Sequence, residues 1–448
     1  MLKNVHDVEA PTHWYNVVAD LPFELPKDIV QPRTPETQNI KLQLPLELVR
    51  QSISRDQYIE IPEEVRQLYK SWRPTPLVRA KNLENWLKTP AKIYYKYEGN
   101  NISGSHKLCT GIAQAYYYKK AGAVRLTTGT GAGQWGTALA VGCRSFDLDC
   151  KVYMVGASYN QKPYRRTIMQ MQGADVVPSP SGAKQNSGLF LDQKKVDTGN
   201  MAFAVTEALA DALSNEGSML SVGSGEAYSI LHSTAIGIEA KEQLSKLGET
   251  PDIVIASLGA GSNFGGIALP ILKDNLEGSK DVRCRSVEPS ACPKLTRGVY
   301  RYDRTDGSGI TPLQKMYTLG NNFRTPNMHA GGLRYHACSK IISALYHHNL
   351  IEAVAYPQTT VFKSAIIFHQ LEGVVPAPES AHAIHGAIQE ALKAKEEGKS
   401  PNILFCLSGH GLYDLSAYEQ FLSGKMNDYS PTDADIADSL EKLPLVEE

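Results

Sequence analysis

The sequence predicts an α/β protein built on largely parallel sheets. Short apolar runs rich in β-branched or aromatic residues alternate with longer segments of helical periodicity. A glycine-rich turn stands at several of the strand-to-helix junctions. Parallel strands need helical crossovers, so both observations favour parallel sheets. With 448 residues, the chain is long enough for two or three domains and for a large core without disulfides.

The elements follow in order along the chain. Residues 1–70 are rich in proline and mixed charge, with an amphipathic piece at 46–72, and they predict an extension packed on the main body. Residues 182–201 are the most polar interruption and predict an inserted or mobile segment. Strands are expected at 92–98, 150–156, 252–258 and 402–408, and helices at 232–248 and 380–398.

Composition excludes several classes of protein. Hydrophobic residues make up 42% of the chain, charged residues 21%, and the formal net charge is −1, which argues against nucleic acid as a partner. The seven cysteines are scattered without a CxxC pair, so neither a disulfide framework nor a metal site is expected. No apolar run is long enough to span a membrane, and the start does not resemble a signal peptide. A cytoplasmic protein without membrane contact is expected.

Three glycine-rich turns follow expected strands, at 128–136, 257–266 and 407–414. Open α/β sheets bind ligands at the carboxyl ends of their strands, so the three turns could form one cleft. The turn at 257–266 suits a phosphate, because glycines let backbone N–H groups approach an anion at a helix N-terminus. A dinucleotide site is the alternative, but Phe264 stands where the third glycine of GxGxxG belongs.

A lysine stands in an unusual place in the stretch 97–115. A polar turn delivers His106 and Lys107 to the start of a helix of small residues. A positive charge is unfavourable at a helix N-terminus, although a solvated surface lysine is tolerated there. Lysines that form Schiff bases have a depressed pKa, and a helix N-terminus beside a histidine lowers it. The residues alone leave both interpretations open.

Several motifs together resemble a known family. The runs SGSHKLCTG, TGAGQWG, GAGSN and LEGVVPAPESAHA are similar to those of fold-type II pyridoxal-phosphate (PLP) enzymes, and in this combination to tryptophan synthase β chains. SWRPTPLVRAKNLE and HAGGLRYH resemble the longer, second type of β chain. The resemblance covers residues 70–425 and implies two three-layer αβα domains with the cofactor in the cleft between them. The implied division is a larger domain at 71–106 and 237–430, a smaller domain at 107–236 and a tail at 431–448.

The resemblance also implies roles for individual residues. Lys107 would hold the cofactor through a Schiff base and move the Cα proton, with His106 beside the phosphate. Ser408 would face the pyridine nitrogen, where a neutral hydroxyl suits β-elimination and replacement. Glu379 would help to orient the ring, or would be an ordinary acid at a helix start. The phosphate would be bound by Gly259, Ala260, Gly261, Ser262 and Asn263. The substrate carboxylate would be bound by Thr130, Gly131, Ala132, Gly133 and Gln134.

Two positions depart from the common pattern. Gly129 stands where most β chains have a glutamate that transfers protons. Glu226, in a glycine-flanked turn, is the candidate replacement, Glu216 is a weaker one, and a solvated turn glutamate is the alternative for Glu226. Arg334 stands near an aspartate of the common β chains, and because arginine binds phosphate bidentately, O-phospho-L-serine could be the donor. A surface or salt-bridged arginine is the alternative, and the donor remains open.

The expected activity is that of a lyase in tryptophan biosynthesis, which condenses indole with L-serine or O-phospho-L-serine to L-tryptophan by β-replacement. The alternatives are a serine or threonine dehydratase or another β-eliminating PLP enzyme, and a catalytically impaired PLP-binding regulatory subunit. The resemblance further implies a homodimer. Binding of a tryptophan synthase α chain and a requirement for a monovalent cation are left open.

Overall fold

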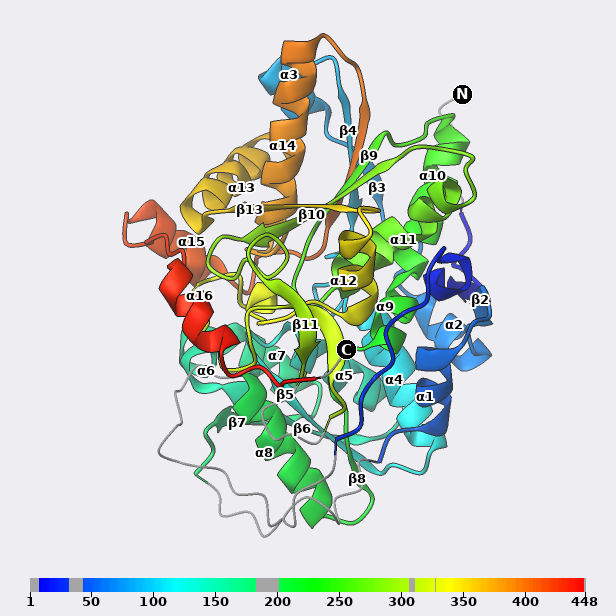
Figure 1. Ribbon diagram of the computed structural model, residues 1–448, viewed down its shortest axis with the longest axis vertical. Coiled ribbons are helices and arrows are strands. Elements are labelled where there is room, and N and C mark those ends of the chain that lie inside the picture. Colours follow the sequence, from blue (N-terminus) through cyan, green and yellow to red (C-terminus); the bar gives the residue numbers. More distant parts are fainter. Residues whose placement is uncertain (1–7, 32–42, 183–200, 306–310, 327, 447–448) are drawn as a thin grey trace.

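The computed structural model describes the chain except for residues 1–7, 32–42, 183–200, 306–310, 327 and 447–448. It has the predicted α/β architecture, with two largely parallel sheets and helices on both faces of each (Figure 1). In Figure 1, the six-stranded sheet occupies the upper half of the molecule and the four-stranded sheet the lower half.

The six-stranded sheet has the order β13-β10-β9-β14-β4-β3. Its strands are β3 (Leu77–Arg79), β4 (Lys92–Tyr97), β9 (Ile253–Ser257), β10 (Arg283–Pro289), β13 (Glu352–Tyr356) and β14 (Asn402–Leu407). All neighbours are parallel except β3 and β4. Helices α3 (Lys81–Leu87), α13 (Gln358–Glu372) and α14 (Ser380–Glu397) cover one face, and α10 (Ala235–Leu247) and α11 (Ser262–Leu276) lie on the other. Side chains of β9 alternate between the two faces, which explains why the strand is apolar throughout.

The four-stranded sheet is parallel throughout, with the order β7-β6-β5-β8. Its strands are β5 (Arg125–Thr130), β6 (Asp149–Val155), β7 (Asp175–Ser179) and β8 (Ser218–Leu220). Its helices are α4 (Leu108–Lys120), α5 (Gln134–Ser145), α6 (Gly156–Gln161), α7 (Pro163–Met171) and α8 (Met201–Ser214). Small residues let α4 and α5 approach closely: a Cβ atom on Gly142 would lie 2.4 Å from the carbonyl oxygen of Gly111.

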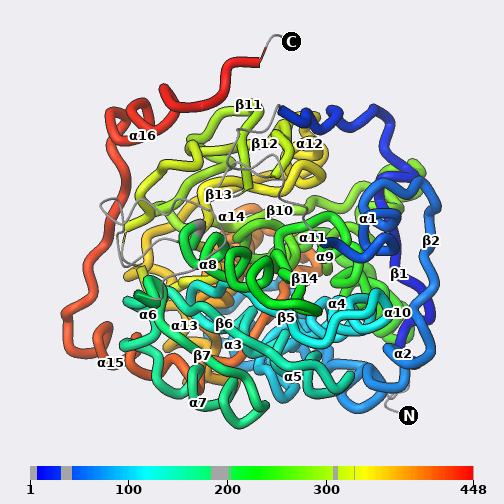
Figure 2. Tube along the Cα trace, turned by 90° about the horizontal axis from the view of Figure 1, so that it is seen from below, coloured from blue at the N-terminus to red at the C-terminus, as the bar shows by residue number. Residues whose placement is uncertain are grey.

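The N-terminal segment packs against this body. Strands β1 (His13–Tyr15) and β2 (Tyr58–Glu60) pair antiparallel, flanked by η1 (Val17–Asp20), α1 (Leu46–Ile53) and α2 (Glu63–Tyr69). Trp14, Leu48 and Val65 are buried in the same hydrophobic cluster as Ile112 of α4. Figure 2 shows this segment on the side of the molecule opposite to α15 (Leu415–Leu422) and α16 (Asp433–Leu440).

The remaining elements belong to the region after β10. Strands β11 (Val299–Asp303) and β12 (Gln314–Thr318) form an antiparallel pair. In the same region, the short helix η3 (Gly331–Leu333) and α12 (Lys340–His347) lie near the strand ends that form the site described next, as does α9 (Ala227–Ser233), which follows β8. No helix within the described residues combines the length and apolarity needed to cross a bilayer.

The predicted strands and helices are confirmed by β4, β6, β9, β14, α10 and α14. The amphipathic piece at 46–72 is divided into α1, β2 and α2, because Pro62 directly precedes α2. The polar interruption at 182–201 falls almost entirely outside the described residues. The domain boundaries stay a prediction.

Candidate active site

Lys107 lies directly before α4, at the end of the turn that follows β4. Its Nζ donates a hydrogen bond to the Ser224 hydroxyl, 3.1 Å away. Desolvation lowers the pKa of Lys107 to about 8, with Glu379 opposing the shift and Arg165 adding to it. The amine is therefore partly neutral near pH 8, as a nucleophile toward an aldehyde must be.

His106 connects three segments at this point. Its backbone N–H donates to the Ser408 carbonyl at 2.9 Å, and its Nε2 lies 3.3 Å from the Ser262 hydroxyl. The turns after β4, β14 and β9 therefore meet here, as predicted from their positions at carboxyl strand ends. Burial, together with the neighbouring Lys107, holds the pKa of His106 well below its usual range, so the ring is neutral.

The glycine turn before α11 is shaped to receive an anion. Gly261 has a φ of 135°, and a Cβ atom on Gly259 would lie 2.5 Å from the carbonyl oxygen of Gly332, so both positions require glycine. Around the turn, buried polar atoms have no hydrogen-bond partner within the described part of the chain. They include Ser339 Oγ, Ser105 Oγ and His106 Nδ1. Buried hydroxyls and a ring nitrogen without partners at a helix N-terminus fit the phosphate of PLP.

Ser408 directly follows β14, and Glu379 directly precedes α14; these two segments lie side by side. The Ser408 hydroxyl is 2.8 Å from the Ser380 hydroxyl, and both are buried. Glu379 Oε1 accepts a hydrogen bond from the Gly332 N–H at 2.7 Å, whereas its buried Oε2 has no partner among the described residues. A neutral hydroxyl and a half-satisfied carboxylate fit the polar atoms of a pyridine ring.

Residues 130–134 run from the last residue of β5, through the loop at 131–133, to the first residue of α5. Gly133 has a φ of 97° and directly precedes the helix, so the loop presents backbone N–H groups at a helix N-terminus. A Cβ atom on Gly331 would lie 2.6 Å from the Ala132 Cβ, and one on Gly332 would lie 3.1 Å from both Gln134 Oε1 and Glu379 Oε1. The loop therefore faces Glu379 across the Gly331–Gly332 turn.

Arg334 follows that turn. Its guanidinium donates to the Ser158 hydroxyl at 3.1 Å and forms no ion pair with any residue that the structure describes. Burial lowers the pKa of Arg334, an effect that Glu379 opposes. A desolvated cation with a single hydroxyl partner has unused capacity for an anion.

A second buried group of charges lies close to the loop. Asp414 binds Lys162 at 2.7 Å and Arg165 at 3.0 Å, and all three side chains are buried. Burial disfavours ionised Asp414, but the two cations outweigh this and hold the pKa of its carboxyl below the usual value. The group carries one excess positive charge, and Arg165 contacts the position of Gly133. Sequence reasoning missed this group, because its members are separated by up to 252 residues.

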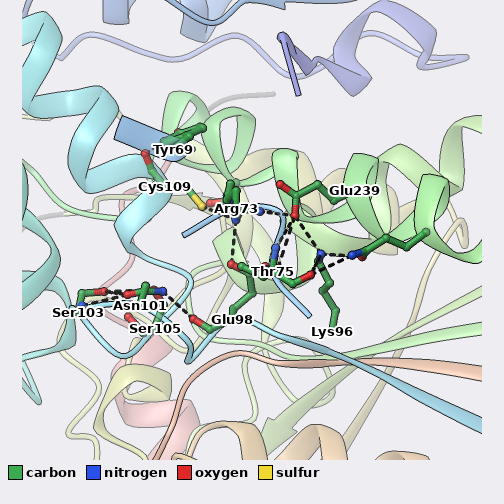
Figure 3. Close-up of polar contacts among 12 residues, drawn as sticks. Tyr69, Arg73, Thr75, Lys96, Glu98, Asn101, Ser103, Ser105, Cys109 and Glu239 are labelled. Carbon is green, nitrogen blue, oxygen red and sulfur yellow. Dashed lines mark hydrogen bonds and ion pairs between the residues drawn. The ribbon is translucent and has the colours of Figure 1, made fainter. Parts of the chain in front are cut away.

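A buried ionic network holds the strand that leads into the site (Figure 3). Arg73 lies 2.8 Å from both Glu98 and Glu239, and Lys96 lies 2.9 Å from Glu239. All four side chains are fully buried. Asn101 Nδ2 donates to the Glu98 carbonyl at 2.8 Å, which connects the network to the polar turn after β4.

Gly129 has no room for a longer side chain. A Cβ atom there would lie 2.7 Å from the Val205 nitrogen and 2.9 Å from the Ala204 carbonyl carbon, both in the backbone of α8. A glutamate at this position would therefore require α8 to shift. The glycine that replaces the usual glutamate at position 129 therefore packs closely against α8.

The two candidate glutamates lie at opposite ends of β8. Glu226 is partly buried and directly precedes α9, after the strand's carboxyl end. Its turn borders the site, because Ser224 binds Lys107 and a Cβ atom on Gly225 would lie 3.1 Å from the Ala260 Cβ. Glu216 is exposed and precedes β8, so it lies at the amino end of the sheet and is not a candidate.

Fold and site together define a PLP-dependent enzyme of fold type II. The family model "Pyridoxal-phosphate dependent enzyme" matches residues 68–409. Among solved structures, a fungal L-serine ammonia-lyase from Rhizomucor miehei has a TM-score of 0.58 at 17% identity, covering 79% of this chain and 98% of its own. A threonine deaminase from T.th. has a TM-score of 0.56 at 16% identity, covering 82% and 99%. At these identities, the likeness concerns the fold alone.

Curated relatives narrow the class. Tryptophan synthase beta chain 2 of Methanosarcina mazei is 51% identical over 93% of this chain and 95% of its own length. The tryptophan synthase beta chain of Thermococcus onnurineus is 50% identical over 95% and 96%, and beta chain 2 of Pyrococcus furiosus 46% over 98% and 99%. The chain belongs to the tryptophan synthase β chain family, second type.

Proposed function

We propose that the chain catalyses the tryptophan synthase β reaction, in which indole replaces the β-substituent of a serine-type donor to give L-tryptophan. The observation that carries the proposal is the meeting of the His106–Lys107 turn, the glycine turn before α11 and the backbone of Ser408 at one set of strand ends. Relatives of about half-identical sequence that bear this name support the same activity.

The residues have distinct roles in this proposal. PLP, when bound, withdraws electrons from the amino acid's Cα. Lys107 would hold the cofactor at its aldehyde, and once the amino group of the substrate has displaced it there, the freed amine could take the Cα proton, for which a pKa lowered to about 8 is suited. The turn at 259–263 would hold the phosphate, with His106 beside it. Ser408 would face the pyridine nitrogen without adding a charge, and Glu379 would help to orient the ring.

Residues 130–134 bind the carboxylate of the amino acid in this scheme. The N-terminal end of α5 carries a partial positive charge, and the loop's backbone N–H groups are short-range donors. The nearby Lys162 and Arg165 exceed the charge of Asp414 by one, which favours an anionic substrate further. The loop therefore needs no charged side chain of its own.

We infer that O-phospho-L-serine is a better donor than L-serine. Arg334 supports this inference, because its partly buried guanidinium donates to the Ser158 hydroxyl and forms no ion pair in the described part of the chain. A phosphate would supply the anion that this cation lacks. Phosphate is also a better leaving group than hydroxide, which reduces the need for the acid that is missing at Gly129.

Glu226 is proposed to accept the proton that indole loses. Its turn borders Lys107 through Ser224, and its position at the carboxyl end of β8 is on the same edge of the sheet as the loop at 130–134. Because α8 occupies the space beside Gly129, the proton acceptor must come from another segment.

Product analysis tests the proposal. Purified protein with PLP, indole and either donor should form tryptophan. Pyruvate formed equally with and without indole would favour a dehydratase, the activity class of the structural neighbours. Cofactor binding without turnover would favour the impaired regulatory subunit.

The homodimer remains a prediction from the family resemblance, and the cytoplasmic location a prediction from the sequence. Whether an α chain binds, and whether a monovalent cation is required, stays open. Gel filtration of the purified chain, alone and with an α chain, tests the homodimer and the binding of an α chain.

A further inference from the structure

Lys294 is a fully buried lysine that the proposed mechanism does not use. It lies in the turn after β10, and three oxygen atoms face its ammonium. The carbonyl oxygens of Leu258 and Cys292 are each 3.4 Å from Nζ, and Glu288 Oε2 is 3.9 Å away. Moving an ammonium from water into the protein interior costs free energy, which these three oxygens only partly offset, so a role for this lysine is expected.

Leu258 is the residue directly before the glycine turn at 259–263. A turn that offers its N–H groups to an anion points carbonyl oxygens away from it, and these buried oxygens need donors of their own. The Ala260 carbonyl is satisfied by the Ser339 N–H at 2.8 Å. For Leu258, the donor is the Lys294 ammonium, which also places a positive charge behind the turn.

Glu288 fixes the loop that carries this lysine. Its carboxylate accepts hydrogen bonds from the Leu295 N–H at 3.1 Å, the Thr296 N–H at 2.9 Å and the Thr296 hydroxyl at 2.7 Å. Burial raises the pKa of Glu288, while the Lys294 ammonium and these hydrogen bonds lower it. The lysine is thus held by a neighbour of opposite charge that is itself immobilised.

Oxygen atoms, the kind of ligand that a monovalent cation takes, surround Nζ. The two backbone carbonyl oxygens accept long hydrogen bonds from the ammonium, and one carboxylate oxygen lies nearby. Carbonyl oxygens are also the ligands that replace water around K⁺ in proteins.

We propose that the Lys294 ammonium is a built-in cation that supports the glycine turn, so that the protein needs no K⁺, Na⁺ or NH₄⁺ to bind PLP. The proposal rests on the proposed role of this turn as the phosphate site. The charge behind the turn keeps the Leu258 carbonyl in place and favours a phosphate dianion on the opposite side. Loss of the ammonium leaves a site that a free cation can enter.

The wild-type chain gives the first test. PLP affinity, from fluorescence titration of the apoprotein, and the apoprotein Tm should be equal in KCl and in choline chloride of the same ionic strength. A severalfold gain in PLP affinity in KCl would overturn the proposal without any variant.

Two matched variants give the second test. In choline chloride, Lys294→Ala should weaken PLP binding by about tenfold or more and lower the Tm, because the Leu258 carbonyl loses a charged donor. KCl or NH₄Cl should restore both properties, because the truncated side chain leaves room for the ion. Lys294→Met should show the same loss without recovery, since the side chain fills the space.

Each outcome has a meaning. Indifference of Lys294→Ala to the cation, or equal recovery of Lys294→Met, would contradict the built-in cation. If a cation restored the Tm but not the PLP affinity, the role of Lys294 as a built-in cation would be supported. The proposal that the turn at 259–263 binds the phosphate would then be wrong. If neither variant folds in any salt, the wild-type comparison decides.

Discussion

Replacement of Arg334 by alanine gives the sharpest test of the donor. The guanidinium is largely desolvated and forms no ion pair within the described residues, so a donor phosphate would be its principal anion. A hydrogen bond to a charged group contributes about 1.5–3 kcal/mol. Since about 1.4 kcal/mol corresponds to tenfold in affinity, the KM for O-phospho-L-serine should rise by about 10- to 100-fold.

The same variant should leave the KM for L-serine within about threefold, because serine has no phosphate to lose a contact with. Its Tm should not fall, since truncation removes a partly buried charge that forms no ion pair within the described residues. Arg166→Ala is the matched control: this half-buried arginine of α7 lies 4.5 Å from the Tyr159 ring centre, and its loss changes net charge equally. KM values for both donors, measured at one ionic strength, provide the assay. Equal effects on both donors, or a Tm lower by several degrees, would refute the phosphate role.

Four further predictions concern the other site residues. Lys107→Ala should abolish the visible absorbance of lysine-bound PLP, and a reducible adduct on another lysine would contradict the assignment. In the wild type, the rate of PLP incorporation should rise with pH and level off above about 8. The reason is that the pKa of Lys107 is lowered to about 8 and only the neutral amine reacts. Stopped-flow rates that keep rising to pH 10 would argue against this. Glu226→Gln should keep the PLP spectrum and the donor KM but reduce kcat by about 100-fold, and unchanged turnover would remove Glu226 from the mechanism. Gly129→Glu should destabilise the protein by about 1–3 kcal/mol and should not raise kcat, because its Cβ overlaps the α8 backbone; a stable, faster variant in thermal and kinetic assays would show that the helix can move.

Much of the fold could be predicted because local pattern and final structure agree. The strands at β4, β6, β9 and β14 are apolar runs bounded by turns, and each is followed by a segment of helical period. The amphipathic piece at 46–72 was predicted only as part of an extension packed on the main body, and its division into α1, β2 and α2 was not predicted. The strand β2 within it pairs with β1, a tertiary contact that local propensity does not reveal.

The site was less predictable, because its charges come from distant segments. The unusual place of Lys107 at a helix start made it a candidate, and the family resemblance gave it a role; the glycine turn was a candidate because it follows an expected strand. The group formed by Asp414, Lys162 and Arg165 carries no local signal, and neither does the contact between Gly129 and α8. Likewise, only the direction of β8 separates Glu226 from the weaker candidate.

The most direct test of the central claim is an isotope experiment. Purified wild-type protein with PLP, unlabelled indole and O-phospho-L-serine labelled with ¹³C at Cβ is analysed by mass spectrometry, with labelled L-serine in a parallel reaction. The account predicts tryptophan carrying the label at Cβ, formed faster from the phosphorylated donor, with little labelled pyruvate while indole is present. Labelled pyruvate as the main product from both donors, with no labelled tryptophan, would contradict it.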